Sequence, residues 1–171
     1  MKRISYLFLA LCMAVVFLPA ANAEWVSLNG AQEGTGPNVT LDRSNSDSVV
    51  VTVDIPGFYI AETELNGTSF HSLRIPDAGR SLEVGLPEVP KITVEVAIPD
   101  FGQVSVSELS RHSSSFNGYV VAPMQVHTTD IDPQPDFVIN EKAYQDGTFP
   151  VSGTVMTTPA ICRDVRFVKV D

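Results

Sequence analysis

The clearest hydrophobic pattern in the chain is an alternation of apolar and polar residues over Lys91–Ile98. One face of this stretch would carry Ile92, Val94, Val96 and Ile98, and the other Lys91, Thr93, Glu95 and Ala97. A period of two residues is typical of a strand that is buried on one face. The Gly-Leu-Pro-Glu-Val-Pro run over 85–90 excludes a helix, because proline lacks the amide donor. We therefore predict that the chain arrives extended from Gly85 and forms a half-buried strand that Pro99 ends.

Similar short runs, separated by turn residues, recur along the rest of the chain, and almost no segment has apolar residues at helical spacing. Further strands are predicted over 25–28, 48–54, 58–65, 69–75, 101–109, 118–123, 151–156 and 162–170. Residues 125–129 are predicted to extend the strand over 118–123, and 140–144 to form one helical turn. Asn66-Gly67 is the strongest hairpin signal, because this pair tolerates the positive φ of a type I′ turn. The pattern predicts an all-β fold, most simply an antiparallel sandwich of two sheets.

The first 23 residues have the pattern of a signal peptide rather than of folded structure. Two basic residues follow Met1, residues 6–18 are uncharged and mostly apolar, and Ala21-Asn22-Ala23 suits signal peptidase. The apolar run is shorter than the roughly 20 residues that a membrane-spanning helix needs. We predict cleavage before Glu24 and a secreted protein, periplasmic or extracellular, with no membrane attachment after signal removal. Residues 24–171 are then expected to form one domain, or part of a larger one.

Charge and cysteine content narrow the possible partners and the means of stabilisation. Without the signal peptide, 9 Lys and Arg face 20 Asp and Glu, a net charge of −11. This surface excludes nucleic acid as a partner, and we interpret the acidity as solvation rather than as a docking face. Cys162 is the single cysteine left, so no internal disulfide is expected.

The end of the sequence falls inside a predicted strand. No turn or polar tail follows the strand over 162–170 before Asp171. Either this strand lies at a sheet edge, or the sequence is the front of a longer protein. We favour the second interpretation, and with it a sandwich that is truncated at its C-terminal end.

Nucleophilic catalysis has no recognisable motif in this chain. Cys162 would need His71, His112 or His127 as a base, and a lone cysteine in a predicted strand is more often a core residue. The serines of Ser113–Ser115 lack the Gly-x-Ser-x-Gly elbow that exposes a nucleophile. We expect no catalytic residue here.

Metal and cofactor binding are equally poorly supported. Asp130, Asp132 and Asp136 are the candidate ligands for calcium, but they do not follow the spacing of a calcium loop. The histidines lack the spacing of a zinc site, and no glycine-rich phosphate loop is present. We interpret the aspartates as a solvated turn, with no metal and no cofactor.

Three stretches of the chain resemble the propeptides of gingipain-type cysteine peptidases, which are secreted bacterial enzymes made as inactive precursors. The first is Gly85-Leu-Pro-Glu-Val-Pro90 with the strand that ends in Ala97-Ile-Pro99. The others are Tyr144 through Phe149-Pro150, and Arg163-Asp-Val-Arg166. The likeness covers about the last two-thirds of the mature chain and is weak before Gly34.

The resemblance implies a β-sandwich that keeps a peptidase latent during export, assists its folding and is removed by proteolysis. Its partner would be the cognate catalytic domain, in cis or also in trans, and the catalytic Cys and His would lie in that domain. We therefore expect no peptidase activity from these 171 residues. A free-standing secreted β-sandwich for adhesion or surface interaction, and a separately encoded inhibitor, are the alternatives; the sequence beyond Asp171 distinguishes them.

An inhibitory propeptide needs a loop that enters the cleft of its enzyme. Two loops carry an arginine that would suit an enzyme with a preference for basic residues: Ser110–Asn117 with Arg111, and Pro76–Gly85 with Arg80. The plain alternative, that both side chains are ordinary solvated loop residues, is the interpretation that we favour. The sequence does not show which of the two loops would enter a cleft.

Overall fold

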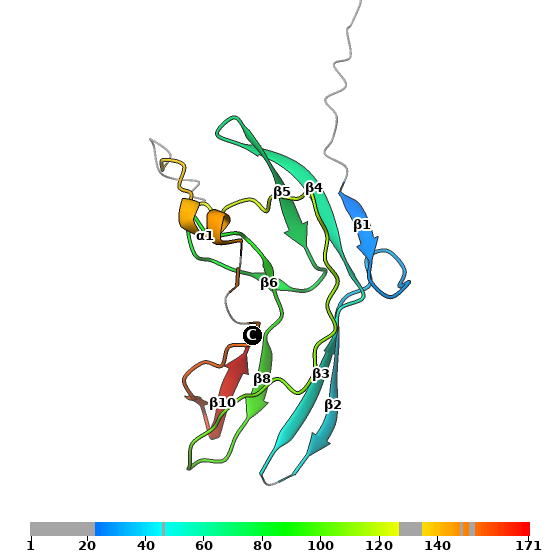
Figure 1. The fold of residues 1–171 in the computed structure, drawn as a ribbon. Helices are drawn as coiled ribbons and strands as arrows, with labels where there is room; N and C mark the ends of the chain where they lie inside the picture. The colour runs from blue at the N-terminus through cyan, green and yellow to red at the C-terminus, as the bar shows by residue number, and fades with distance from the viewer. Residues whose placement is uncertain (1–22, 46, 127–134, 148, 151–152) are drawn as a thin grey trace, which may run out of the picture.

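The computed structural model describes residues 23–45, 47–126, 135–147, 149–150 and 153–171 (Figure 1). The elements among them are, in chain order, β1 (Glu24–Ser27), β2 (Asn38–Ser44), β3 (Val49–Asp54), β4 (Gly57–Leu65), β5 (Thr68–Arg74), β6 (Gly79–Arg80), β7 (Pro90–Lys91), β8 (Val94–Ala97), α1 (Glu141–Asp146), β9 (Ala160–Cys162) and β10 (Val165–Val170). All strand pairs between these elements are antiparallel, so the predicted all-β class is confirmed.

The upper half of the molecule in Figure 1 is built on the sheet β1-β4-β5. The predicted hairpin is present: β4 and β5 pair up to Leu65 and Thr68, and Asn66 and Gly67 have φ values of 49° and 74°. Both values are positive, as a type I′ turn requires. Ile60 and Phe70 are buried on this sheet, with 6% and 3% of their surfaces exposed. Local turn chemistry and core burial therefore support the same register.

Backbone hydrogen bonds extend this sheet beyond β5. The His71 amide donates to the Val120 carbonyl, and the Ala122 amide donates to the His71 carbonyl. The other edge of the segment around Val120 and Ala122 faces the 85–90 run. There the Met124 amide donates to the Leu86 carbonyl at 2.8 Å. The predicted strand over 118–123 is thus an extended, bridged segment next to the 85–90 run.

Gly85 is the junction of three segments. Its amide donates to the Met124 carbonyl, and its carbonyl accepts from the Asn140 amide. Its φ is +82°, and a Cβ built on it would lie 3.0 Å from a methyl of Val138. Glycine alone adopts this conformation without strain, and the space beside it holds no larger residue.

The predicted helical turn is the short helix α1. The Asn140 side chain accepts from the Ala143 amide at its start, and Gly147 ends it in the left-handed conformation. The Tyr144 hydroxyl donates to the Val121 carbonyl at 2.7 Å, which ties α1 to the extended sheet. Burial raises the pKa of Tyr144 to about 12.

Replacing Tyr144 by phenylalanine is expected to lower the free energy of unfolding by about 1 kcal/mol, because the Val121 carbonyl loses its donor. Urea unfolding at pH 7 measures this change. The raised pKa of Tyr144 gives a second measurement. The stabilisation by the protonated Tyr144 side chain is complete below the ordinary tyrosine pKa of 10.0, and it is lost as the pH rises toward 12. A phenylalanine variant as stable as the wild type would contradict the assigned hydrogen bond.

The lower half contains the three-stranded sheet β8-β10-β9, and Val168 at its centre is 2% exposed. Burial alternates along Lys91–Ile98 as predicted. However, one continuous strand was the wrong prediction: β7 pairs with β6, β8 pairs with β10, and Ile92 and Thr93 separate them. The chain changes partner within a stretch whose pattern is uninterrupted.

The predicted strand over 162–170 is also two strands. Arg163 has a φ of 55°, so the chain turns between β9 and β10 and folds back on itself. Because β10 lies between β8 and β9, it is a central strand and the edge interpretation is wrong. Only part of the predicted strand over 151–156 is described, and Met156 bridges Val170.

The side chain of Asp171 holds the β7–β8 junction in place. It accepts from Lys91 Nζ at 2.9 Å and from Thr93 Oγ1 at 2.6 Å. Burial acts to raise the pKa of Asp171, but these two hydrogen bonds and the charges of Lys91 and Lys169 outweigh it. The pKa therefore lies below the ordinary 3.8.

We expect Asp171→Asn to lower the free energy of unfolding at pH 7 by about 0.5–1 kcal/mol, since the Lys91 ammonium is partly exposed. Because the pKa of Asp171 is lowered, the stabilisation by its ionised carboxylate is complete above pH 3.8. It is lost as the pH falls through the lowered pKa of the folded state. Urea unfolding at several pH values between 2 and 7 tests this. The free energy of unfolding of the variant should fall less steeply toward low pH than that of the wild type. Lys142→Gln, in an ion pair whose lysine side chain is 86% exposed, is the control that should change little.

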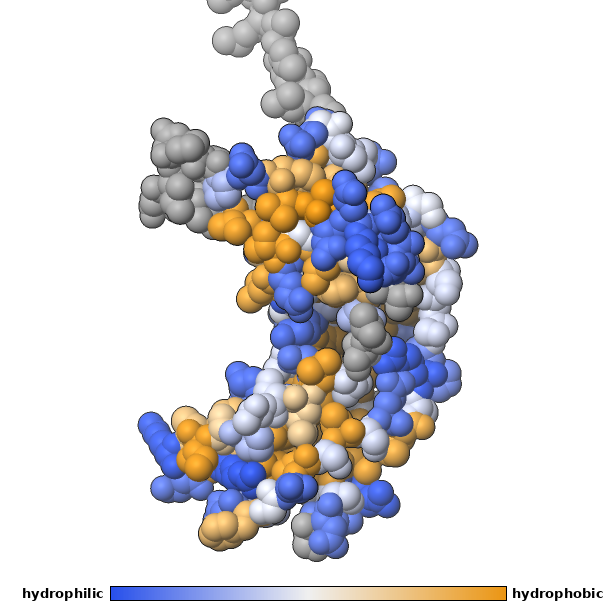
Figure 2. Space-filling model, turned by 60° about the vertical axis from the view of Figure 1, so that its left-hand side comes forward, coloured by the Kyte–Doolittle hydropathy of each residue, from blue (hydrophilic) through white to orange (hydrophobic). Residues whose placement is uncertain are grey.

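The two-stranded sheet β2-β3 forms the other side of the lower half. In Figure 2 the molecule has the shape of a crescent that is hollowed between its two ends. The sequence predicted β3 but missed β2, which is exposed along its whole length. Val39 and Leu41 of β2 stand opposite Val53 and Val51. Their alternation was present in the sequence, but it is short and flanked by polar residues.

The predicted strand over 101–109 is wrong. Among the described residues, no backbone hydrogen bond joins residues 103–117 to another segment, so we call this stretch the free segment. Phe101 is 90% exposed and Leu109 is 74% exposed. Alternation shows which residues would share a face of a strand, but a strand also needs backbone pairing with a neighbour, and this stretch makes none within the described residues. In the part of the chain that is described, no helix is long and apolar enough to cross a membrane.

Candidate functional site

Arg80 lies in β6 and is held by its surroundings. β6 pairs with β7, and Arg80 Nη1 lies 2.6 Å from Glu88 Oε1. The side chain borders a hollow of about 460 Å³ over β4 and β5, where the Arg74 guanidinium stacks 4.5 Å from the centre of the Tyr59 ring. Both the backbone and the side chain of Arg80 therefore have partners within this chain.

Arg111 lies in the free segment. Its guanidinium donates to both carboxylate oxygens of Glu108, through Nε at 2.8 Å and through Nη2. The hydrogen bond and then the charge of Glu108 raise the pKa of Arg111. The guanidinium also lies against the backbone at Gly153, where an added Cβ would meet it. The side chain is 51% exposed, so this pair is a surface pair of small energy.

The backbone distinguishes the two arginines more clearly than the side chains do. Arg80 is already part of a two-stranded sheet. The backbone groups of the free segment are not used within the described chain, so they remain able to pair with a binding partner. Of the two predicted residues, Arg111 is therefore the one whose backbone is unpaired within the described chain.

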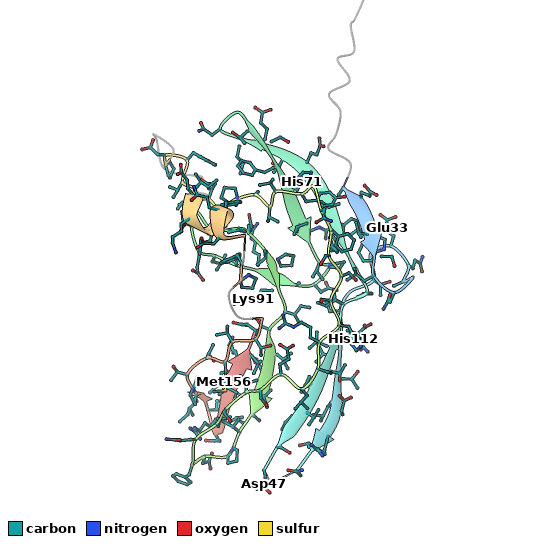
Figure 3. The ribbon with its side chains drawn as sticks, in the orientation of Figure 1. Glu33, Asp47, His71, Lys91, His112 and Met156 are labelled. Carbon is teal, nitrogen blue, oxygen red and sulfur yellow. The ribbon has the colours of Figure 1, made fainter. Side chains whose placement is uncertain are left out.

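The groups tested for catalysis do not come together. Cys162 is exposed in β9, so its interpretation as a core residue is wrong. His71 lies in the upper half, where its Nδ1 accepts from the Val120 amide, whereas His112 lies in the free segment well apart from it (Figure 3). His127 is outside the described residues.

The remaining candidates add no further site. Ser113–Ser115 are exposed in the free segment. Asp130 and Asp132 lie outside the described residues, and Asp136 is exposed. In the described ranges, no group of three acidic, histidine or cysteine residues is placed to hold a metal ion.

One residue of interest was missed, because Phe101 was assigned to a strand. The neighbouring Pro99, Asp100 and Gly102 are turn residues, and they were the available signal for a loop. In the folded chain Phe101 lies on a loop whose two ends accept hydrogen bonds from Arg166.

Fold and site together define an all-β domain whose candidate site is an exposed, extended segment that carries an arginine. The family model Propeptide_C25 matches residues 29–171. The chain therefore belongs to this family, the propeptides of gingipain-type cysteine peptidases, and the match begins earlier than the predicted resemblance did.

A solved structure has the same fold. It belongs to a study of the zymogenic latency of gingipain K from Porphyromonas gingivalis, and it is 22% identical in sequence, with a TM-score of 0.67. The likeness covers 88% of this chain and 85% of that chain. No curated protein matches the sequence.

Proposed function

We propose that this chain is the pro-region of a secreted gingipain-like cysteine peptidase precursor, which keeps the peptidase latent, assists its folding and is removed by proteolysis. The observation that carries the proposal is the match to the propeptide family over residues 29–171. The fold shared with a structure concerned with the latency of gingipain K supports it. The partner is the catalytic domain of the same precursor, in cis, and the separated chain also binds it in trans.

In this proposal the free segment enters the cleft of the peptidase and blocks it. Its unpaired backbone pairs with the cleft walls in the way that an extended substrate does. Arg111 fills the pocket for a basic side chain, after exchanging its exposed partner Glu108 for groups of the enzyme. Breaking that pair costs little, because the two side chains are 51% and 38% exposed and water screens their charges.

Inhibition in trans tests this function directly. The purified chain is mixed with the active catalytic domain of a gingipain-type peptidase, and initial rates of peptide hydrolysis are measured against the concentration of the chain. We expect a dose-dependent fall in rate at micromolar concentration or below. Unchanged rates at micromolar concentration would count decisively against an inhibitory role.

Export is the second part of the proposal. The basic start, the apolar run and Ala21-Asn22-Ala23 support removal of a signal peptide before Glu24. Mass spectrometry of the chain recovered from the periplasm or the medium of an expressing bacterium should give a mature N-terminus at Glu24. Recovery of uncleaved chain from the cytoplasm would contradict it.

A further inference from the structure

Phe101 is held on a fixed loop with its ring in solvent. The loop Pro99–Gly102 follows β8 and lies at the lower end of the molecule (Figure 1). Arg166 of β10 donates through Nη1 to the Pro99 carbonyl at 2.7 Å and through Nη2 to the Gly102 carbonyl at 3.2 Å. The planar guanidinium thus bridges the two ends of the loop that carries Phe101.

Other exposed apolar side chains lie at the same end of the sheet as this loop. β8 ends, and the turn between β9 and β10 is formed, at the same end of the sheet, since the Ile98 amide donates to the Arg166 carbonyl. Ile161, which pairs with Arg166, is 72% exposed on one face of this end, and Val165, which pairs with Cys162, is 52% exposed on the other face. Phe101 is 90% exposed. Exposed apolar side chains that gather at one end of a molecule are typical of protein interaction sites.

Phe101 is continuous with the segment that carries Arg111. The two residues are ten positions apart, and an extended chain of that length spans at most about 35 Å. A protein–protein interface of ordinary size buries about 800 Å² on each partner, which covers a distance of that order. One partner can therefore contact both residues at once.

We infer that the Phe101 loop is a second attachment point for the peptidase, in which the Phe101 ring enters an apolar depression on the catalytic domain outside the cleft. This inference rests on the proposed function and names a further contact of the same complex. Aromatic side chains that enter a partner's pocket carry a large share of binding energy. Because Arg166 already holds the loop, little ordering entropy is lost when the complex forms. Phe101 is the contact residue, and Arg166 is its positioning residue.

The test separates this contact from the cleft. The peptidase is first inactivated with a small covalent inhibitor that occupies its cleft, and binding of the purified chain is measured by surface plasmon resonance. We expect Phe101→Ala to raise the Kd for this blocked peptidase about 30-fold, the size of an interface hot spot. Phe101→Leu should restore most of the affinity, because the contact is apolar. Arg111→Ala should leave this Kd unchanged.

Control variants separate the Phe101 contact from a general loss of apolar surface and from a loss of folding. Leu82→Ala removes an apolar side chain that is 69% exposed on another loop, and it should leave the Kd unchanged. Combining Arg166→Ala with Phe101→Ala should weaken binding no further than Phe101→Ala alone, because Arg166 acts through the loop. Urea unfolding of Phe101→Ala should match the wild type.

The outcomes distinguish this inference from the proposed function. If the wild-type chain inhibits the active peptidase but Phe101→Ala binds the blocked peptidase within twofold of wild type, the second attachment point is wrong and the pro-region function stands. If the wild-type chain neither inhibits nor binds, both are overturned. A 30-fold loss that Leu82→Ala reproduces would also overturn the inference, because the loss would then not be specific to Phe101.

Discussion

Replacing Arg111 by alanine is expected to raise the inhibition constant of the chain against a gingipain-type peptidase about 100-fold. Arginines that are buried on binding are frequent hot spots, and 100-fold corresponds to about 2.7 kcal/mol. The loss is large because the pocket of the enzyme would be left with an unpaired acidic group, whereas the free chain loses a surface pair with Glu108 and a contact with the backbone at Gly153. Initial-rate inhibition assays with a peptide substrate measure the change.

Matched variants decide whether the effect belongs to the cleft. Arg80→Ala removes the other candidate arginine, which is paired with Glu88 in the sheet of β6 and β7, and it should leave the inhibition constant within about threefold. Arg111→Lys should recover part of the affinity. Because Arg111 is half exposed, its alanine variant should unfold at the wild-type urea concentration. The opposite ranking of the two alanine variants would move the cleft-entering role to Arg80.

Replacing Gly85 by alanine is expected to lower the free energy of unfolding by about 3 kcal/mol. A residue with a side chain in a left-handed conformation costs about 1–2 kcal/mol. Here the added Cβ would also lie 3.0 Å from Val138 and 3.3 Å from the Asn140 amide, and overpacking of this kind costs roughly 1–3 kcal/mol. The strained residue would be the one whose backbone bonds to both Met124 and Asn140. The substitution should therefore also weaken the attachment of α1 to the sheet.

Gly118→Ala separates the two contributions. Gly118 has a φ of +87°, close to that of Gly85, but no atom lies within 4 Å of a Cβ built on it. Its alanine variant should therefore lose only the conformational part, about 1 kcal/mol. Urea unfolding of both variants gives the difference. Equal losses in the two variants would show that packing at Gly85 contributes nothing.

The sequence anticipated the elements whose signals are local. Asn66-Gly67 forms the predicted turn because its two residues tolerate positive φ without help from elsewhere. Asn140 begins the predicted helical turn because its own side chain caps the backbone. The alternation over Lys91–Ile98 correctly separated the more buried face from the exposed one, since burial on one face leaves a period of two in any strand.

Predictions that depended on a pairing strand elsewhere in the chain were less successful. The predicted alternation over 101–109 is short, and no backbone hydrogen bond pairs this stretch with another described segment. The strands over 91–98 and 162–170 were each predicted as continuous, and each divides where the backbone changes partner or turns back at Arg163. Cys162 has the residue type of a core position, but β9 is short and leaves it exposed.

The sequence by itself determined the all-β class, the main hairpin and the propeptide family, because propensity, turn chemistry and motif residues are properties of short stretches. The tertiary structure alone decided which of two loop arginines stands on an unpaired backbone and which aromatic ring is held in solvent. Pairing and exposure depend on segments far apart in the chain: Arg166 holds the Phe101 loop across more than sixty residues. No pattern within 99–117 records whether a partner strand lies beside it.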